Sequence, residues 1–249
     1  MAATLLLALA FAATSPTAHS FDSAGTQLRY LEAGTGDAVI LLHGLDASAE
    51  LNWVRPGIFD DVAAHHRAIA LDLRGHGESD QPVDDASYGE PYVDDVVRLM
   101  DHLGIERARI VGYSLGGMIA MKLAVEHPER VVDVTLGGMG WVKDGSPEAQ
   151  RFGRAASDGL FALLRLAPAA AARGLRRLGV TEAQVKALAL PVTMIVGDRD
   201  PTKRLFVDPL HAARPDFPVV VIPGAGHLSC VGKPAFKAAI AALLAASPK

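Results

Sequence analysis

A serine lies between two glycines in the pentapeptide Gly112-Tyr113-Ser114-Leu115-Gly116, which fits the pattern G-x-S-x-G. The apolar residues Ile110 and Val111 precede it, and a helical pattern begins at Leu115. A serine on such a sharp strand-to-helix turn takes a strained backbone conformation, and its hydroxyl projects above the sheet. Glycine is needed at positions 112 and 116 because side chains there would collide across the turn. The pattern therefore predicts that Ser114 is a nucleophile.

A serine hydroxyl is a weak nucleophile, so it needs a base and an acid that orients the base. Two later apolar runs, residues 192–196 and 219–222, are each followed by candidates for these roles. Asp198 and Asp200 follow the first run, and His227 follows the second after a Gly-Ala-Gly turn. Parallel strands present their carboxyl ends at one edge of a sheet, where open α/β sheets bind ligands. We therefore predict His227 as the base and one of the two aspartates as the acid.

Short, unbroken apolar runs recur along the chain, as in strands that are covered on both faces. Helical patterns lie between them, in residues 92–103, 115–126 and 233–246. Alternating polar and apolar residues at 28–32 predict an antiparallel strand with one solvated face. The apolar runs are residues 38–42, 68–71, 109–111, 131–136, 192–196 and 219–222. This alternation predicts an α/β fold with a mostly parallel central sheet flanked by helices.

One long segment, residues 141–190, interrupts the alternation because it contains helical stretches, such as 148–166 and 181–189, and no convincing strand. We predict that it is a small helical cap inserted into a core formed by residues 21–140 and 191–249. The cap carries eight basic residues against four acidic ones. We interpret this basic excess as a solvated helix face, with attraction of an anionic substrate or surface as the alternative.

From about residue 21 to its C-terminus, the chain resembles proteins of the α/β-hydrolase family. Members carry a Gly-x-x-Asp pattern whose aspartate is the triad acid, and residues 197–200 match it with Asp200. The resemblance implies a triad of Ser114, Asp200 and His227, which also follow one another in the expected chain order. Asp198 is the alternative acid.

Residues 43–45, His-Gly-Leu, follow the first buried run and are similar to the His-Gly motif of the same family. By that resemblance, the backbone N–H groups of Leu45 and Leu115 form the oxyanion hole. Two fixed donors aimed at the developing negative charge make a large contribution to catalysis. His43 is expected to be structural and not a proton carrier. Residues 72–79 resemble another signature loop of the family, with a role in packing near the site.

The resemblance implies a serine hydrolase that hydrolyses a small-molecule carboxylic ester through an acyl-enzyme. Carbon–carbon bond hydrolases and cofactor-free perhydrolases share the triad and stay open as alternatives. A binding protein that keeps the triad with hardly any turnover is the alternative outside the enzymes. The serine at position 114 argues against haloalkane dehalogenases and epoxide hydrolases, whose pattern has aspartate there. The short cap favours an open pocket and short or medium acyl groups.

The composition excludes several other classes of protein. A formal net charge of −4 with 21% charged residues does not indicate a nucleic-acid-binding protein. Neither G-x-G-x-x-G nor H-E-x-x-H occurs, so we expect no cofactor and no metal. The single cysteine, Cys230, cannot form an intramolecular disulfide and is interpreted as a buried structural thiol. The oligomeric state is left open.

Residues 1–20 differ in composition from the rest of the chain. An apolar stretch at residues 2–13 is followed by Ala18-His19-Ser20, which places small residues where a signal peptidase cleaves. The stretch is shorter than the roughly 20 residues that span a bilayer. We therefore predict a signal peptide and export to the periplasm or the medium. The cytoplasm is the alternative because the segment before the apolar stretch contains no Lys or Arg.

Overall fold

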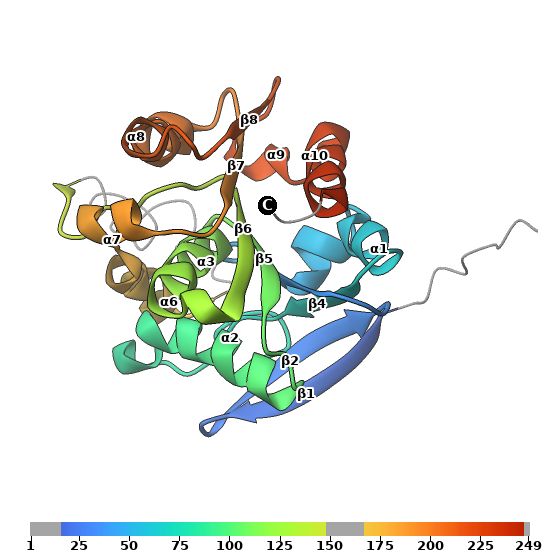
Figure 1. Cartoon of the computed structure of the whole chain (residues 1–249). Coiled ribbons are helices and arrows are strands. Elements are labelled where there is room, and N and C mark those ends of the chain that lie inside the picture. Colours follow the sequence, from blue (N-terminus) through green and yellow to red (C-terminus); the bar gives the residue numbers. More distant parts are fainter. Residues whose placement is uncertain (1–15, 148–166, 247–249) are drawn as a thin grey trace, which may run out of the picture.

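The computed structural model describes residues 16–147 and 167–246, and an eight-stranded sheet forms its centre (Figure 1). The strand order is β1-β2-β4-β3-β5-β6-β7-β8. The pairs β1–β2 and β2–β4 are antiparallel, whereas β3 to β8 all run parallel. The strands are β1 Thr17–Ser23, β2 Thr26–Ala33, β3 Ala38–Leu42, β4 Arg67–Leu71, β5 Ala108–Tyr113, β6 Val131–Gly137, β7 Val192–Gly197 and β8 Val219–Ile222. The predicted α/β fold with a mostly parallel sheet is confirmed.

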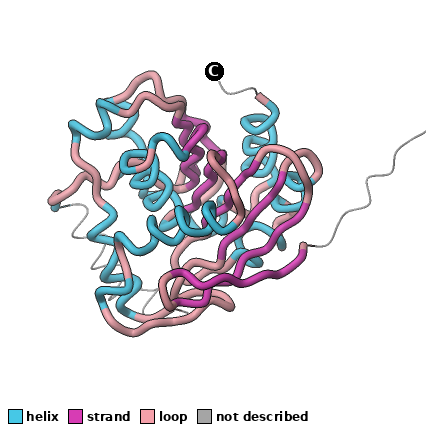
Figure 2. The backbone as a smooth tube through the Cα atoms, turned by 60° about the horizontal axis from the view of Figure 1, so that its bottom comes forward, coloured by secondary structure: helices cyan, strands magenta, loops and turns pink. Residues whose placement is uncertain are grey.

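Helices cover both faces of the sheet and create two hydrophobic cores (Figure 2). The alternation along β3 shows the division, because Ile40 and Leu42 enter one core while Val39 and Leu41 enter the other. The first core includes α2 and α3, and the second includes α1 and α10. This double burial is why the central strands are continuous apolar runs in the sequence. The α-helices are α1 Ile58–Ala63, α2 Glu90–His102, α3 Leu115–Glu126, α6 Ala169–Gly174, α7 Glu182–Ala187, α8 Asp208–Ala213, α9 His227–Cys230 and α10 Pro234–Ala245.

Short 3₁₀ or π-helical turns complete the described elements: η1 Glu50–Val54, η2 Asp85–Ser87, η3 Pro128–Arg130, η4 Leu175–Leu178 and η5 Lys203–Val207. Between β6 and β7, the described residues contain α6, η4 and α7, together with one isolated bridge between Lys143 and Val180. The helix expected at residues 148–166 lies outside the described residues. Within the described ranges, no helix combines the length and the apolar composition needed to cross a bilayer.

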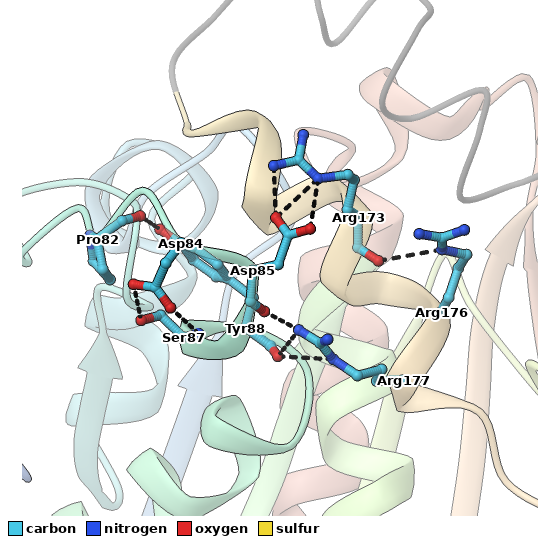
Figure 3. Close-up of polar contacts among 8 residues, drawn as sticks. All are labelled: Pro82, Asp84, Asp85, Ser87, Tyr88, Arg173, Arg176 and Arg177. Carbon is cyan, nitrogen blue, oxygen red and sulfur yellow. Dashed lines mark hydrogen bonds and ion pairs between the residues drawn. The ribbon is translucent and has the colours of Figure 1, made fainter.

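The segment α6–η4 is attached to the loop around η2 by arginine side chains (Figure 3). The Arg173 guanidinium donates two hydrogen bonds of 2.6 and 2.9 Å to Asp85 Oδ1. Arg177 donates from Nε and Nη2 to the carbonyl oxygen of Tyr88, at 3.1 and 2.6 Å. The two segments approach each other closely here, since a Cβ on Gly174 would lie 2.6 Å from the Cβ of Tyr88. These contacts attach the segment α6–η4 to the core of the fold.

Ion pairs involve four of the basic residues between positions 141 and 190. Lys143 and Lys186 both pair with Glu182, at 3.0 and 2.8 Å. Arg173 and Arg177 pair with the acidic residues Asp85 and Glu90 of the core, at 2.6 and 3.6 Å. These four cations of the described part therefore face carboxylates of the protein itself, which favours a structural role for them over attraction of an anionic substrate.

The N-terminal strand β1 includes residues that the sequence placed in the signal peptide. Thr17 to Ser20 pair with Glu32 to Arg29 of β2 in an unbroken antiparallel register. Phe21 and Ser23 are the buried residues of β1, and the residues before Phe21 in the strand are exposed. Cleavage after Ser20 would remove the exposed half of β1 and leave its buried anchors in place. Residues 1–15, which contain the apolar stretch, lie outside the described residues.

Arg109 connects the start of β5 to the end of the last helix. Its Nη1 donates to the carbonyl oxygen of Leu244 at 2.6 Å, and its Nη2 donates to that of Leu243 at 2.8 Å. Its Nε forms an ion pair of 2.8 Å with Asp133 of β6. Because the last carbonyl groups of a helix have no partners within it, the guanidinium caps α10 and anchors it to the sheet.

We expect the substitution Arg109→Met to lower the free energy of unfolding by about 2–4 kcal/mol, because it leaves buried acceptors and a carboxylate without their partner. The decrease is measured as a shift of the urea midpoint. Arg107→Met is the control, since Arg107 is exposed and donates one hydrogen bond, of 2.8 Å, to the Val131 carbonyl. A control that loses as much stability as Arg109→Met would contradict this account.

Candidate active site

Ser114 occupies the turn between β5 and α3 with φ of 51° and ψ of −110°. Positive φ is rare for a residue other than glycine and stores strain. The turn is also tight, because a Cβ on Gly112 would lie 2.1 Å from the Gly116 carbonyl oxygen. A Cβ on Gly116 would lie 2.0 Å from the carbonyl oxygen of Leu42 in β3. The two motif glycines are therefore required by backbone contacts, as the sequence pattern predicts.

The structure brings Ser114, His227 and Asp200 together in one hydrogen-bonded chain. Ser114 Oγ lies 2.9 Å from His227 Nε2, and His227 Nδ1 lies 2.8 Å from Asp200 Oδ2. Because a carboxylate accepts, Nδ1 carries the ring proton and donates to Asp200. The unprotonated Nε2 then accepts from the Ser114 hydroxyl. This is the tautomer in which the imidazole can remove a proton from the serine.

Asp200 is buried and makes further hydrogen bonds around its carboxylate. Its Oδ1 accepts from the Thr202 backbone N–H at 2.9 Å and from the Thr202 hydroxyl at 2.6 Å. Burial raises the pKa of Asp200, but the hydrogen bond from His227 and those from Thr202 outweigh it, and the pKa lies below its ordinary value. The acid is therefore ionised at neutral pH and held in one orientation.

Asp198, the alternative acid, has a different contact. It is exposed, and its Oδ1 accepts from the Ala225 backbone N–H at 3.2 Å. Hydrogen bonds from the backbone N–H groups of Gly224 and Ala225 lower the pKa of Asp198. The two loops touch at Gly197, where a Cβ would lie 2.1 Å from the Ala225 carbonyl oxygen. Asp198 therefore braces the turn that leads to His227, while Asp200 contacts the imidazole.

Tyr113 is a residue of the site that the sequence did not indicate. Its hydroxyl donates to the carbonyl oxygen of His227, and its ring centroid lies 5.7 Å from that of the imidazole. Gly137 and Gly138 provide space for the tyrosine ring, since Cβ atoms there would lie 2.8 and 2.9 Å from it. Only its place in the pentapeptide could have drawn attention to Tyr113, and the pattern accepts any residue at that second position.

Thr202 is the second residue that the sequence did not indicate, although it lies two positions after the acid. Cys230 is buried at the end of α9, and burial raises the pKa of its thiol to about 11. This agrees with its interpretation as a structural thiol. Among residues 16–147 and 167–246, no group of three or more His, Cys, Asp or Glu side chains is arranged to hold a metal ion.

The loop that follows β3 lies beside the nucleophile. A Cβ on Gly44 would lie 3.4 Å from Ser114 Cβ, so Gly44, the residue before Leu45, borders the serine. Leu115 is the first residue of α3, and its N–H therefore has no acceptor within its own helix. The two N–H groups predicted for the oxyanion hole thus belong to the residue after Gly44 and the residue after Ser114.

The fold and the site define a class of protein, and a family comparison agrees with it. A model of the alpha/beta hydrolase fold family matches residues 37–167. The chain belongs to this family.

Among individual proteins, the chain is similar to 2-hydroxy-6-oxo-6-phenylhexa-2,4-dienoate hydrolase of Comamonas testosteroni. The two are 44% identical over 115 residues, which cover 45% of this chain and 40% of that protein. The 2-hydroxymuconate semialdehyde hydrolase of Pseudomonas sp. (strain CF600) is 36% identical over 118 residues, which cover 47% of this chain and 41% of that protein. The chain thus spans less than half the length of these curated relatives.

A solved structure extends the likeness over nearly the whole fold. The 2-hydroxy-6-oxo-6-phenylhexa-2,4-dienoate hydrolase from Rhodococcus sp. strain RHA1 superposes with a TM-score of 0.72. The superposition has 25% sequence identity and covers 92% of this chain and 97% of that chain. This likeness in fold agrees with the membership of the chain in the alpha/beta hydrolase fold family.

Proposed function

We propose that the protein is a serine hydrolase that hydrolyses small-molecule carboxylic esters through an acyl-enzyme. The observation that carries this proposal is the hydrogen-bonded chain from Ser114 through His227 to Asp200, with contacts of 2.9 and 2.8 Å. Such a chain supplies a nucleophile, a base in hydrogen-bond reach and an acid that orients the base. The family membership supports the same reaction class.

In the first half of the proposed reaction, His227 Nε2 takes the hydroxyl proton while Ser114 Oγ attacks the ester carbonyl carbon. The carbonyl oxygen becomes an oxyanion, which accepts hydrogen bonds from the N–H groups of Leu45 and Leu115. Asp200 stabilises the imidazolium that forms. His227 then gives its proton to the departing alkoxide, and the acyl group stays on Ser114.

In the second half, His227 Nε2 takes a proton from water as the water oxygen attacks the acyl carbonyl carbon. The bond between this carbon and Ser114 Oγ breaks, and His227 returns the proton to the serine. The carboxylic acid leaves, and the free enzyme is restored. No cofactor takes part in either half of this scheme.

Carbon–carbon bond hydrolysis is a second candidate, and the names of the relatives favour it. The two curated relatives and the solved structure are hydrolases of 2-hydroxy-6-oxo-6-phenylhexa-2,4-dienoate or 2-hydroxymuconate semialdehyde. In that chemistry the leaving group is a carbanion, so the substrate itself must delocalise the electron pair. Ester hydrolysis makes no such demand, because the alkoxide needs only the proton from His227. The same triad can serve ester hydrolysis, carbon–carbon bond hydrolysis and the perhydrolase reaction.

A fluorophosphonate probe and a substrate panel test the proposal together. Nitrophenyl esters of increasing chain length are compared with a lactone and with 2-hydroxy-6-oxo-6-phenylhexa-2,4-dienoate. We expect labelling of Ser114 and steady turnover of short or medium esters. Turnover of the dienoate alone would favour the second candidate. Labelling of Ser114 without turnover of any substrate would indicate a binding protein that keeps the triad. Absence of both labelling and turnover would overturn the proposal.

Two predictions about the chain's organisation stay proposals. We propose that residues 141–190 cover the site as a small helical cap, which is supported by the contacts of α6 and η4 with the loop around η2. We also propose export, which rests on the apolar stretch and the small residues within positions 1–20. Export to the periplasm or the medium would place the hydrolase where it meets extracellular small molecules.

A further inference from the structure

The peptide that carries the proposed oxyanion donor Leu45 is held by side chains on both sides of Gly44. The Gly44 N–H donates to Asn52 Oδ1 at 2.8 Å. The Gly44 carbonyl oxygen accepts from His43 Nδ1 at 2.8 Å and from the Ala47 N–H at 3.2 Å. Both side chains are buried, so water does not compete for these bonds. Each hydrogen-bonding group of Gly44 therefore has a fixed direction.

The hydrogen bonds of His43 also determine which ring nitrogen carries the proton. The Leu73 backbone N–H, which can only donate, lies 3.0 Å from His43 Nε2. Nε2 must therefore accept, and the ring proton lies on Nδ1, from which it is donated to the Gly44 carbonyl. Burial also lowers the pKa of His43, so the imidazole stays neutral. The ring is thus a fixed link between the loop after β4 and the loop after β3.

We propose that His43 is a positioning residue that aims the Leu45 N–H at the oxyanion of the reaction, through its hydrogen bond to the Gly44 carbonyl. In a trans peptide the carbonyl of one residue and the N–H of the next point in opposite directions. The described chain contains no cis peptide bond, so fixing the Gly44 carbonyl also fixes the Leu45 N–H. This inference rests on the proposed function, because it assumes that an oxyanion forms beside Ser114.

A positioning role differs from a purely structural one in the kinetic parameter that it changes. The oxyanion exists in the transition state and not in the bound ester, so a misaligned donor lowers kcat and leaves KM nearly unchanged. Removal of one donor from an oxyanion hole costs about 10²- to 10³-fold in rate. A donor that is present but poorly aimed is expected to cost about 10- to 100-fold.

Two substitutions at position 43 separate the two hydrogen bonds of the ring. The amide nitrogen of His43→Asn lies near the position of Nδ1, so it can still donate to the Gly44 carbonyl. The amide of His43→Gln reaches the position of Nε2, so it can accept from Leu73 but loses the bond to Gly44. We expect His43→Gln and His43→Ala to lower kcat about 10- to 100-fold with KM changed less than about threefold. His43→Asn is expected to restore most of the lost kcat.

A trifluoromethyl ketone supplies a second measurement, because Ser114 would add to it and form a stable oxyanion. Its inhibition constant is expected to rise in His43→Gln by about the factor by which kcat falls. His76→Asn is the matched control. His76 is also buried, its ring centroid lies 5.2 Å from that of His43, and its Nδ1 contacts the Arg74 carbonyl instead of Gly44. This control is expected to lower the melting temperature and to change kcat less than about threefold.

Equal kcat values for His43→Asn and His43→Gln would overturn the inference. It would also be overturned if the decrease in kcat parallels the decrease in melting temperature in all variants, including His76→Asn. If the His43 variants do not fold, Asn52→Ala releases the other side of Gly44, and an unchanged kcat in that variant would equally overturn it. The wild-type protein is measured in parallel. A wild type that neither reacts with the fluorophosphonate nor hydrolyses an ester overturns the proposed function, and the inference with it.

Discussion

Ser114→Ala is expected to lower kcat for ester hydrolysis by about 10⁴- to 10⁶-fold, because no other group can form the acyl-enzyme and the remaining site supplies only binding and electrostatic stabilisation. Labelling by the fluorophosphonate should disappear in the same variant. Steady-state kinetics and mass spectrometry of the labelled protein measure the two effects. An unaltered hydrolysis rate in Ser114→Ala would show that another group carries the reaction.

Ser114→Gly is the companion variant, and it separates catalysis from backbone strain. Both substitutions remove the nucleophile, so both should be inactive. Alanine keeps a Cβ at φ of 51° and ψ of −110°, whereas glycine adopts this conformation without steric cost. We therefore expect Ser114→Gly to be more stable than Ser114→Ala by about 1 kcal/mol, measured by urea unfolding. Equal stability would indicate that the turn is not strained by its side chain.

Asp200→Asn is expected to lower kcat by about 10⁴-fold, because the amide no longer fixes the imidazole tautomer or stabilises the imidazolium. Asp198→Asn is the matched control from the same loop. Its side chain still offers an oxygen to the Ala225 N–H, so kcat should change less than about tenfold. Comparable losses in the two variants, measured with the same ester, would contradict the assignment of the acid.

The loop of the acid was predictable from the sequence, but the choice between its aspartates needed the family pattern. Asp198 and Asp200 are separated by one residue, and both follow the strand β7. Spacing alone cannot say which carboxylate is buried against the next loop. In the structure, Asp200 is held by Thr202 and His227, whereas Asp198 contacts the backbone of the turn before His227. The difference is one of tertiary contact and not of local sequence.

Most of the sheet was predictable because its central strands are buried on both faces and are therefore continuous apolar runs. The predicted ranges for β3 and β8 coincide with the strands of the structure, and that for α3 with its helix. The strand β1 was not predicted, since its residues before Phe21 are exposed and carry no apolar pattern. Such an edge strand forms because β2 offers free backbone partners, which a local pattern does not reveal.

The positioning contacts of the site were the least predictable part. Tyr113 meets His227 across 114 positions of sequence, and His43 meets the Leu73 N–H across 30. Neither contact has a local signature, because each depends on how two loops approach at the edge of the sheet. The ion pairs of the basic residues between positions 141 and 190 were equally hard to predict. The number of these basic residues was readable from composition, but their acidic partners in the loop around η2 became visible only in the fold.

The proposed base follows β8, the outermost strand of the sheet, which has four residues and pairs on one side only. Regions with few neighbours open at lower free energy than the centre of a domain. The proposed nucleophile, in contrast, follows the central strand β5. The proposed catalytic assembly therefore joins the centre of the sheet to one of its two edges. On warming, we therefore expect activity to be lost before the whole fold unfolds, because the edge at β8 opens locally first.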